Sequence, residues 1–241
     1  MEKDFEKNGI NENYGCLFGV GVGPGDPELL TLAAVHAIEN ADIIAFPGKT
    51  KEDSTAYSIP AKVIPGYTEK PAVPIELPMT KNQDELRTIH EKAAAQLEKY
   101  LRDEKDVAFL TLGDPSFYST YAYIDEKVRA DGFETEIIPG ITSFSAIAAK
   151  LQVPIVLGSE TVKIQTGLDR NLDTDTENLI ILKAGRNAGK IRDQLKTAGF
   201  KAAMVCNAGM KDEKIYATID DIPEMEGYFS LMLAKKQRVE G

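Results

Sequence analysis

The first residues of chemical interest form the glycine-rich stretch GVGPGDPELLT, which ends at Thr31 and follows a short apolar run. A dinucleotide-binding loop has the spacing G-x-G-x-x-G, which lets a pyrophosphate approach the first turn of a helix. Counted from Gly19 the sixth residue is Pro24, and counted from Gly21 it is Asp26. Asp26 before Pro27 is instead typical of a helix N-cap, whose carboxylate would repel a phosphate. We therefore expect no dinucleotide here.

Other phosphate and metal sites are also not expected. The fragment GKT at 48–50 has Ile43 where a P-loop needs glycine, and GRNAGKI at 185–191 is one residue short and lacks the terminal hydroxyl. His36 and His90 lie alone in helical patterns, without the spacing of metal ligands. The acidic stretch 169–178 has the composition of a solvated loop. The sequence thus predicts neither a nucleoside triphosphate nor a metal.

Composition excludes further classes of protein. The chain has 241 residues and a formal net charge of −10, which argues against binding to a nucleic acid backbone. No run approaches the roughly 18 apolar residues that a membrane-spanning helix needs. Cys16 and Cys206 are far apart and each flanks an apolar run, so we expect two buried thiols and a cytoplasmic location. The polar residues 1–14 are predicted to form a flexible tail.

Hydrophobic periodicity predicts an α/β protein of two domains, at residues 15–114 and 115–241. In the first domain, apolar runs alternate with helical patterns, which is typical of a largely parallel sheet. The second domain is richer in strands. The predicted helices are 27–41, 82–103, 116–129 and 143–151. The predicted strands lie around CLFGVG, DIIAFPG, VPIELP (as an edge strand), DVAFLTLGDP, TEIIPG, VKIQT, NLIILKAG, AAMVCNA, KIYAT and YFSLMLA.

Three segments, in their order and spacing, resemble the tetrapyrrole (corrin/porphyrin) methylase family: the stretch from Gly21 to Gly48, LTLGDPSFYSTYAYI from Leu110, and IIPGITSFSAIAAKLQVPIVLGSE from Ile137. The similarity runs from about Gly15 to Lys236. GDPSFYSTY, PGITSFSA and KAGRN are most similar to the branch that methylates C20 of precorrin-2. The resemblance implies two α/β domains with a cofactor cleft between them, S-adenosylmethionine (SAM) as cofactor, a tetrapyrrole substrate and a homodimer.

The same resemblance implies the cofactor contacts. They transfer by motif to Pro24, Leu112, Gly113, Asp114, Phe117, Thr142, Ser143, Ala184 and Ala234. A sulfonium cofactor needs no phosphate cradle, so backbone groups and small side chains suffice, and glycine lets the backbone come close. Asp114 has a second interpretation as the N-cap of the helix predicted from Ser116, and the Thr142–Ser143 pair could only cap the next helix.

Where siroheme-forming relatives place an aspartate proposed as a proton acceptor, this chain has Pro47. The absence of that aspartate favours C20 of a reduced macrocycle as the carbon that is methylated. For this carbon, alignment with the sulfonium methyl group is the main catalytic requirement. Should a base be needed, Tyr118 is the first candidate and Glu160 another, whereas Tyr121 and Tyr123 are equally well explained by helix packing. The candidate substrate contacts are Lys49, Ser54 and Arg186. Lys49 and Arg186, with Lys51 and Lys183, are the candidate partners of substrate carboxylates, although each of these taken singly could be an ordinary surface charge.

The expected activity is therefore methyl transfer from SAM to C20 of precorrin-2 or of cobalt-factor II, in cobalamin biosynthesis. The alternatives are another corrin-ring or uroporphyrinogen methyltransferase and, more distantly, a methylase acting on diphthine or ribosomal RNA. From another class, the chain could be a tetrapyrrole-binding carrier or an inactive partner subunit without turnover.

Overall fold

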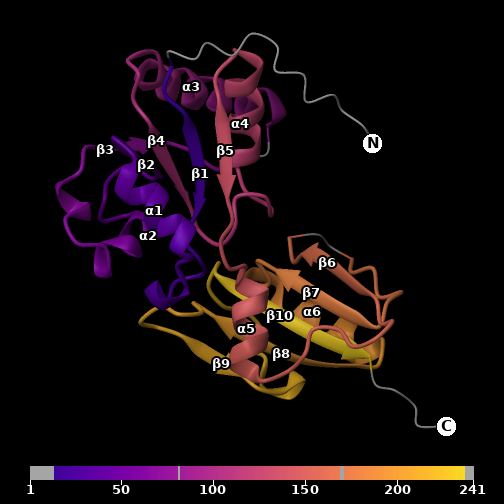
Figure 1. The fold of residues 1–241 in the computed structure, drawn as a ribbon. Coiled ribbons are helices and arrows are strands. Elements are labelled where there is room, and N and C mark those ends of the chain that lie inside the picture. The colour runs from indigo at the N-terminus through magenta and orange to yellow at the C-terminus, as the bar shows by residue number, and fades with distance from the viewer. Residues whose placement is uncertain (1–13, 81, 169–170, 237–241) are drawn as a thin grey trace. The chain divides into compact units, whose positions relative to one another are not determined.

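The structure is a computed structural model that describes residues 14–80, 82–168 and 171–236 (Figure 1). Of the tail predicted at residues 1–14, only Tyr14 is among them. The chain divides into two compact units, residues 1–141 and 142–241. The predicted boundary after Asp114 thus falls inside the first unit, because the strand at Thr135–Ile138 pairs with the first strand of the chain.

A parallel sheet of five strands forms the centre of the first unit. The spatial order is β3-β2-β4-β1-β5, so the proline-bracketed strand β3 lies at an edge, as predicted. β4 is buried along its whole length, as expected for a strand covered on both faces. The strands are β1 (Leu17–Gly21), β2 (Ile43–Pro47), β3 (Ala72–Ile75), β4 (Val107–Thr111) and β5 (Thr135–Ile138).

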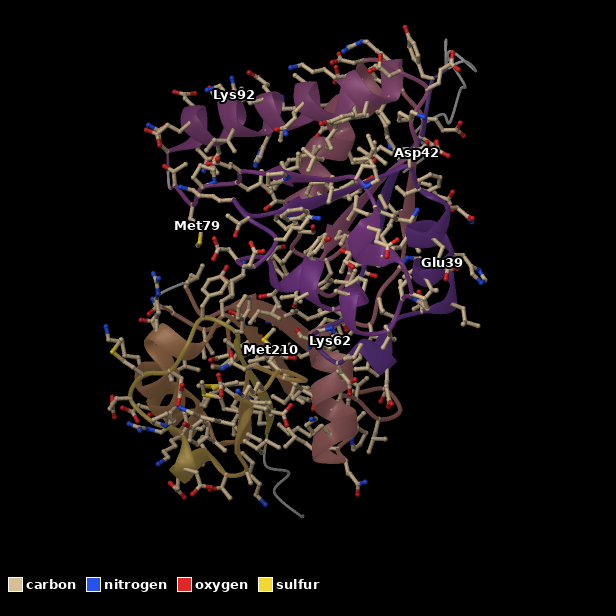
Figure 2. All side chains as sticks on the ribbon, turned by 90° about the vertical axis from the view of Figure 1, so that its left-hand side faces the viewer. Glu39, Asp42, Lys62, Met79, Lys92 and Met210 are labelled. Carbon is tan, nitrogen blue, oxygen red and sulfur yellow. The ribbon has the colours of Figure 1, made fainter. Side chains whose placement is uncertain are left out.

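Helices cover both faces of this sheet (Figure 1). Alternate residues of β4 separate the two cores: Ala108 and Leu110 face the layer of α1 and α2, and Val107 and Phe109 face the layer of α3 and α4. Lys92 projects from the exposed side of α3 (Figure 2). The helices are α1 (Leu32–Asn40), α2 (Thr55–Ser58), α3 (Gln83–Arg102) and α4 (Tyr121–Ala130), with 3₁₀ turns η1 (Pro27–Leu29), η2 (Pro60–Lys62) and η3 (Tyr67–Glu69).

Asp26 caps a 3₁₀ turn, η1, and α1 has a cap of its own. The Glu28 amide donates to Asp26 Oδ1 at 3.0 Å, and the Ala34 amide donates to the hydroxyl of Thr31 at 3.1 Å. The predicted helix 27–41 is therefore two elements, since Leu30 and Thr31 are extended. The capping role predicted for Asp26 is confirmed.

Replacing Asp26 by alanine should lower the free energy of unfolding by about 1 kcal/mol, because the Glu28 amide loses its acceptor. Chemical denaturation measures this. Glu39→Ala, on the exposed side of α1 (Figure 2), is the control and should stay within about 0.5 kcal/mol. A large loss of activity in an Asp26→Ala protein of full stability would contradict a purely structural role.

The helix predicted at 82–103 is confirmed as α3, and its cap is Asn82, whose Oδ1 accepts from the Asp84 and Glu85 amides. The helix predicted at 116–129 instead begins at Tyr121. Tyr118 has φ +47°, a left-handed conformation that a right-handed helix cannot contain. Residues 115–120 are therefore a loop between β4 and α4.

A mixed sheet of five strands forms the second unit, in the order β6-β7-β10-β8-β9. β6 and β7 are parallel, whereas β10 runs antiparallel to β7 and β8, and β9 antiparallel to β8. All five were predicted. Their bounds are β6 (Val162–Thr166), β7 (Asn178–Leu182), β8 (Phe200–Cys206), β9 (Lys214–Tyr216) and β10 (Ser230–Lys236).

Two helices cover the two faces of the second sheet. Alternate residues of β10 again separate the cores, since Leu231 and Leu233 contact the side of α5, and Met232 and Ala234 contact the side of α6. The helices are α5 (Ser143–Leu151) and α6 (Ala188–Thr197), with 3₁₀ turns η4 (Gly185–Asn187) and η5 (Ile219–Asp221).

Both cysteines are free. Cys206 is buried as predicted, whereas Cys16 is only half-buried. Burial of the Cys16 thiol, as the main cause, and the nearby carboxylates, as the second, raise its pKa to about 12. Within the described ranges, none of the helices is both long and apolar enough to cross a membrane.

Candidate functional site

Open parallel α/β sheets bind ligands at the carboxyl ends of their strands, at the point where the loops from two neighbouring strands leave toward opposite faces. The first sheet has such a point. β1 and β4 are such neighbours. The chain leaves β1 for α1 on one face, and leaves β4 for α4 on the other. The tripeptide Gly-Asp-Pro occurs once in each of these two loops, at residues 25–27 and 113–115.

Two glycines join the loops through their backbones. The Gly113 amide donates to Gly23 O at 2.8 Å, and the Gly23 amide donates to Gly113 O at 3.2 Å. Their φ angles are +74° for Gly23 and +78° for Gly113, a region that glycine enters without steric cost. A Cβ on Gly113 would meet no atom within 4 Å. The Gly113 backbone therefore borders unfilled space, although the residue itself is buried.

A third loop joins at Gly140. A Cβ on Gly140 would lie 2.2 Å from Gly113 O, and one on Gly21 would lie 2.6 Å from the Gly140 nitrogen. We call Gly21, Gly113 and Gly140 the glycine junction. Sequence analysis did not single out Gly140, although the pair Pro139–Gly140 directly after a strand was a signal. The junction brings the end of β1 and the loops after β4 and β5 into backbone contact.

The carboxylate of Asp114 connects two of these loops. Its Oδ1 accepts from the Ser116 amide at 2.8 Å and from the Ser116 hydroxyl, and its Oδ2 accepts from the Gly140 amide at 2.9 Å. The residue is 9% exposed. Both oxygens thus have partners within the protein, but the helix N-cap considered for Asp114 is wrong, because α4 begins at Tyr121 and Ser116 lies in the loop before it. Contact of Asp114 with a cofactor stays a prediction.

Pro24 is buried in the loop after β1, next to Gly23. Leu112 and Phe117 are half-buried on either side of Gly113–Ser116. The ring of Phe117 lies edge-on to that of Tyr118, with centroids 5.1 Å apart. The first-unit residues predicted to contact the cofactor therefore belong to two adjacent loops.

The three tyrosines of the motif have different environments. Tyr118 is 57% exposed and has the strained φ noted above, a combination common at functional sites. Tyr121 is fully buried beneath Gly19. This burial, and to a lesser extent the nearby Asp125, raises the pKa of the Tyr121 hydroxyl well above its usual range. Tyr121 therefore suits a packing role and not the removal of a proton. Tyr123 stacks on His90, with centroids 4.9 Å apart. Tyr118 and Tyr123 are thus about equally exposed, at 57% and 58%, but only Tyr118 lies in the loop directly after β4, because Tyr123 belongs to α4.

The loop after β2 contains the predicted substrate contacts of the first unit. β2 is parallel to β4, so this loop emerges at the same edge as Gly113. Lys49 is exposed there, whereas Nζ of Lys51 lies 5.2 Å from the ring centroid of Tyr57. Ser54 is 2% exposed, and its Oγ accepts from the Tyr57 amide at 3.3 Å. The structure thus gives Ser54 the role of a helix cap that holds the loop.

In the second unit, the edge that includes the ends of β7 and β8 and the start of β10 carries two strained residues. Lys183 has φ +56° and Asn207 has φ +52°. The Ala184 amide donates to Ser230 O at 3.0 Å, and the Asn207 amide donates to Phe229 O at 2.7 Å. Ala184 is buried and Arg186 is exposed. Sequence analysis missed Asn207, whose only signal was its position after an apolar strand.

Two predicted residues lie at the other end of this sheet. Ala234 pairs with Leu179 at the start of β7, four residues along β10 from Ser230, which is about 13 Å of strand. The carboxylate of Glu160 accepts from the Leu157 amide at 3.0 Å and lies 3.5 Å from Nζ of Lys235. Neither residue lies at the edge of Ala184. Ala234 lies there because β10 is antiparallel to β7, and Glu160 because it precedes β6, which is parallel to β7; sequence motifs reveal neither pairing.

Thr142 and Ser143 begin α5. Thr142 is the N-cap residue by position, but its side chain makes no capping bond to the helix backbone. Its hydroxyl lies 2.9 Å from the hydroxyl of Ser145. Among the described residues no group of three or more histidine, cysteine or acidic side chains could hold a metal ion.

Comparison with known proteins places these features in a family. The model of the Tetrapyrrole (Corrin/Porphyrin) Methylases matches residues 16–223, so the chain belongs to this family. A probable cobalt-precorrin-2 C(20)-methyltransferase of Methanocaldococcus jannaschii is 34% identical over 233 residues, covering 94% of this chain and 99% of the relative. A precorrin-2 C(20)-methyltransferase of a Sinorhizobium species is 33% identical, covering 91% and 94%.

Solved structures show the same fold. A cobalt precorrin-4 methyltransferase has a TM-score of 0.71 at 20% identity, covering 91% of this chain and 94% of that one. A uroporphyrin-III C-methyltransferase of Thermus thermophilus, solved as a complex with S-adenosyl homocysteine, has a TM-score of 0.64 at 21% identity, covering 91% and 97%. The fold predicted from the sequence, two α/β units of a tetrapyrrole methylase, is confirmed.

Proposed function

We propose that the protein transfers a methyl group from SAM to C20 of precorrin-2 or cobalt-factor II, a step of cobalamin biosynthesis. The observation that carries this proposal is the similarity of 34% identity to a relative named for cobalt-precorrin-2 C20 methylation, over nearly the full length of both chains. The loops with the motifs most similar to that branch lie at the sheet edges described above.

The glycine junction supports SAM as cofactor. SAM is a cation with an amino acid end, and it supplies an electrophilic methyl group when bound. The open space beside the Gly113 backbone fits a ligand of this kind, which needs close backbone approach and no phosphate cradle. From the first unit, Pro24, Leu112, Gly113, Asp114 and Phe117 would hold it; from the second, Thr142, Ser143 and Ala184 would do so. Ala234, at the other end of its sheet, has less support.

Catalysis in this proposal depends chiefly on alignment of substrate and methyl donor. Tyr118 would place an aromatic hydroxyl beside the cofactor loop, and it stays our first candidate should C20 lose its proton on the enzyme. Glu160 has less support as a base, because its carboxylate is engaged by the Leu157 amide, Asn178 and Lys235. Lys49 and Arg186, both exposed, are the proposed partners of substrate carboxylates.

Three further expectations stay proposals. A homodimer is expected from the family resemblance, and the net charge of −10 supports the absence of a nucleic acid partner. A cytoplasmic location agrees with two cysteines that form no disulfide.

The alternative that the protein methylates another carbon of the corrin ring is supported by a different relative. A cobalt-precorrin-4 C(11)-methyltransferase of M. jannaschii is 31% identical over 222 residues, covering 85% of this chain. The carrier alternative would require that the protein bind a macrocycle without turning over SAM.

The test is an anaerobic incubation of the purified protein with labelled SAM and either precorrin-2 or cobalt-factor II, with NMR to locate the transferred methyl. We expect methyl at C20, and the faster substrate distinguishes the metal-free from the cobalt route. Methyl at another carbon would move the enzyme to another step, and bound SAM without transfer would support the carrier.

A further inference from the structure

The turn at residues 183–187, which contains Ala184 and Arg186, rests on a distant part of the chain. Gly185 O accepts from the Glu226 amide at 2.8 Å. A Cβ on Gly185 would lie 2.0 Å from Gly227 O and 2.6 Å from Glu226 O, so the two backbones are in direct contact. A displacement of residues 226–227 must therefore displace Gly185 as well.

The side chain of Glu226 holds that contact in place. Its Oε1 accepts from Nζ of Lys214 at 2.8 Å and from the hydroxyl of Tyr216 at 2.5 Å, and its Oε2 accepts from the Gly227 amide at 3.1 Å. Lys214 and Tyr216 belong to the edge strand β9. The side chain is only 15% exposed. The Lys214 and Tyr216 contacts hold the pKa of Glu226 at about 2, so its charge is present at every physiological pH.

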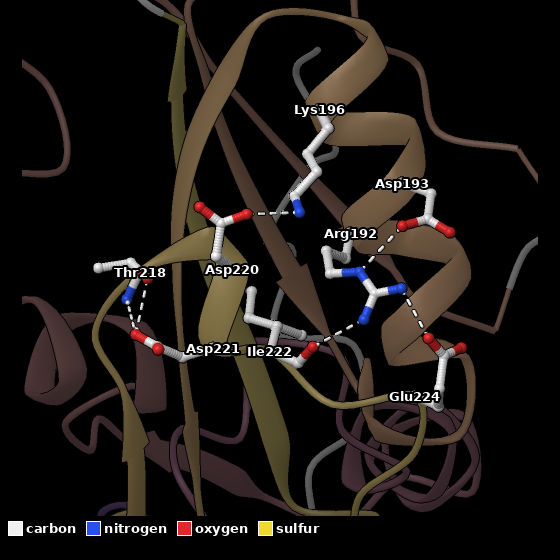
Figure 3. Close-up of polar contacts among 8 residues, drawn as sticks. All are labelled: Arg192, Asp193, Lys196, Thr218, Asp220, Asp221, Ile222 and Glu224. Carbon is white, nitrogen blue, oxygen red and sulfur yellow. Dashed lines mark hydrogen bonds and ion pairs between the residues drawn. The ribbon is translucent and has the colours of Figure 1, made fainter.

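The preceding segment is anchored separately on α6 (Figure 3). Arg192 donates to Ile222 O at 2.9 Å and to Glu224 Oε1 at 2.6 Å, and Lys196 lies 2.5 Å from Asp220. The Gly189 amide donates to Glu224 O at 3.0 Å. The segment up to Glu224 thus follows α6, whereas residues 226–227 depend on Glu226 and β9.

We propose that Glu226 is a positioning residue, which fixes the turn at residues 183–187 through its carboxylate contacts to β9 and its backbone contact to Gly185. The effect of this positioning on binding rests on the proposed function. In that function, Ala184 would contact the cofactor, and Arg186 the substrate, only while the turn is held. Nζ of Lys183 lies 5.7 Å from the ring centroid of Tyr228, which ties the start of the turn to the same segment.

The test compares Glu226→Gln with the matched control Asp220→Asn. Gln keeps the size of the side chain but removes the charge that Lys214 and Tyr216 contact. Asp220, with an exposed ion pair to Lys196, is in the same part of the chain but touches neither Gly185 nor β9 through a described bond. Hydrogen exchange of the SAM-free full chain, SAM affinity by calorimetry and steady-state kinetics are measured for both.

In Glu226→Gln, amide exchange at Asn187 and Glu226 should be about tenfold faster, while the amides of β7 and β10 are unchanged. The Kd and KM for SAM should rise about tenfold, with kcat within about twofold, the size expected for loss of a charge-assisted hydrogen bond. Asp220→Asn should match the wild type. Tyr216→Phe, which removes one of the contacts, should shift the same quantities by a smaller factor.

Wild-type exchange and wild-type SAM affinity in Glu226→Gln would overturn the inference. Faster exchange across the whole second unit would also overturn it, because Glu226 would then serve general stability. If the wild-type protein itself does not bind SAM, the proposed function fails, and the local exchange at Asn187 alone decides whether Glu226 holds the turn.

Discussion

Gly113→Arg should lower SAM affinity at least a hundredfold while the first unit stays folded. The Cβ of the new residue would enter open space beside the glycine junction, so the substitution meets no backbone. The long side chain would then occupy the space proposed for the cofactor. The φ of +78° at this position adds strain of about 1 to 2 kcal/mol, which a folded domain can tolerate. Calorimetry with SAM and circular dichroism of the same samples measure the two effects.

Gly66→Arg is the matched control. Gly66 has φ +69° and lies in the same unit, and a Cβ at this position would likewise meet no atom within 4 Å. It precedes η3 and is not part of the glycine junction. The control should therefore show a similar loss of stability and unchanged SAM affinity. Normal affinity in Gly113→Arg would refute the assignment of the junction as the cofactor site.

Gly140→Ala should have the largest effect on stability of any single methyl added to the first unit's site. The new Cβ would lie 2.2 Å from Gly113 O and 2.8 Å from two Gly21 backbone atoms. Because these are backbone atoms of Gly113 and of the last residue of β1, no side-chain rotation can relieve the overlap. We expect a loss of about 3 kcal/mol or more, as for strong overpacking, measured by urea denaturation.

Gly66→Ala separates this overlap from the ordinary effects of replacing glycine. Its Cβ meets nothing, so only the positive φ contributes, at about 1 kcal/mol. Gly140 is not among the glycines with positive φ, so the loss in Gly140→Ala beyond that in Gly66→Ala is a lower bound on the contribution of the junction. A Gly140→Ala protein as stable as Gly66→Ala would show that the backbones of the three loops are not in contact at the junction.

Local patterns in the sequence were sufficient for most of the secondary structure. The helix from Gln83 to Arg102 has its cap at Asn82 and a clear apolar stripe, and Asp26 before Pro27 marks the start of η1. Such elements depend on residues within a few positions of one another, and those preferences are visible along the chain. The predicted start of α4 at Ser116 was wrong, because a tyrosine in a left-handed conformation carries no local signal.

The sequence by itself therefore determined the alternation of strands and helices, the family through its three motifs, and the absence of a phosphate-binding pattern in the first glycine-rich loop. Tertiary structure alone decided where the parts of a site meet. The pairing of β5 with β1 extends the first unit to Ile141. The antiparallel course of β10 puts Ala234 at the far end from Ala184, and the parallel pairing of β6 with β7 does the same for Glu160. It also joins Gly21, Gly113 and Gly140, and seats Glu226 on Gly185. These contacts join residues between 27 and 119 positions apart, and they arise from strand order and backbone packing, which side-chain patterns along the chain do not encode.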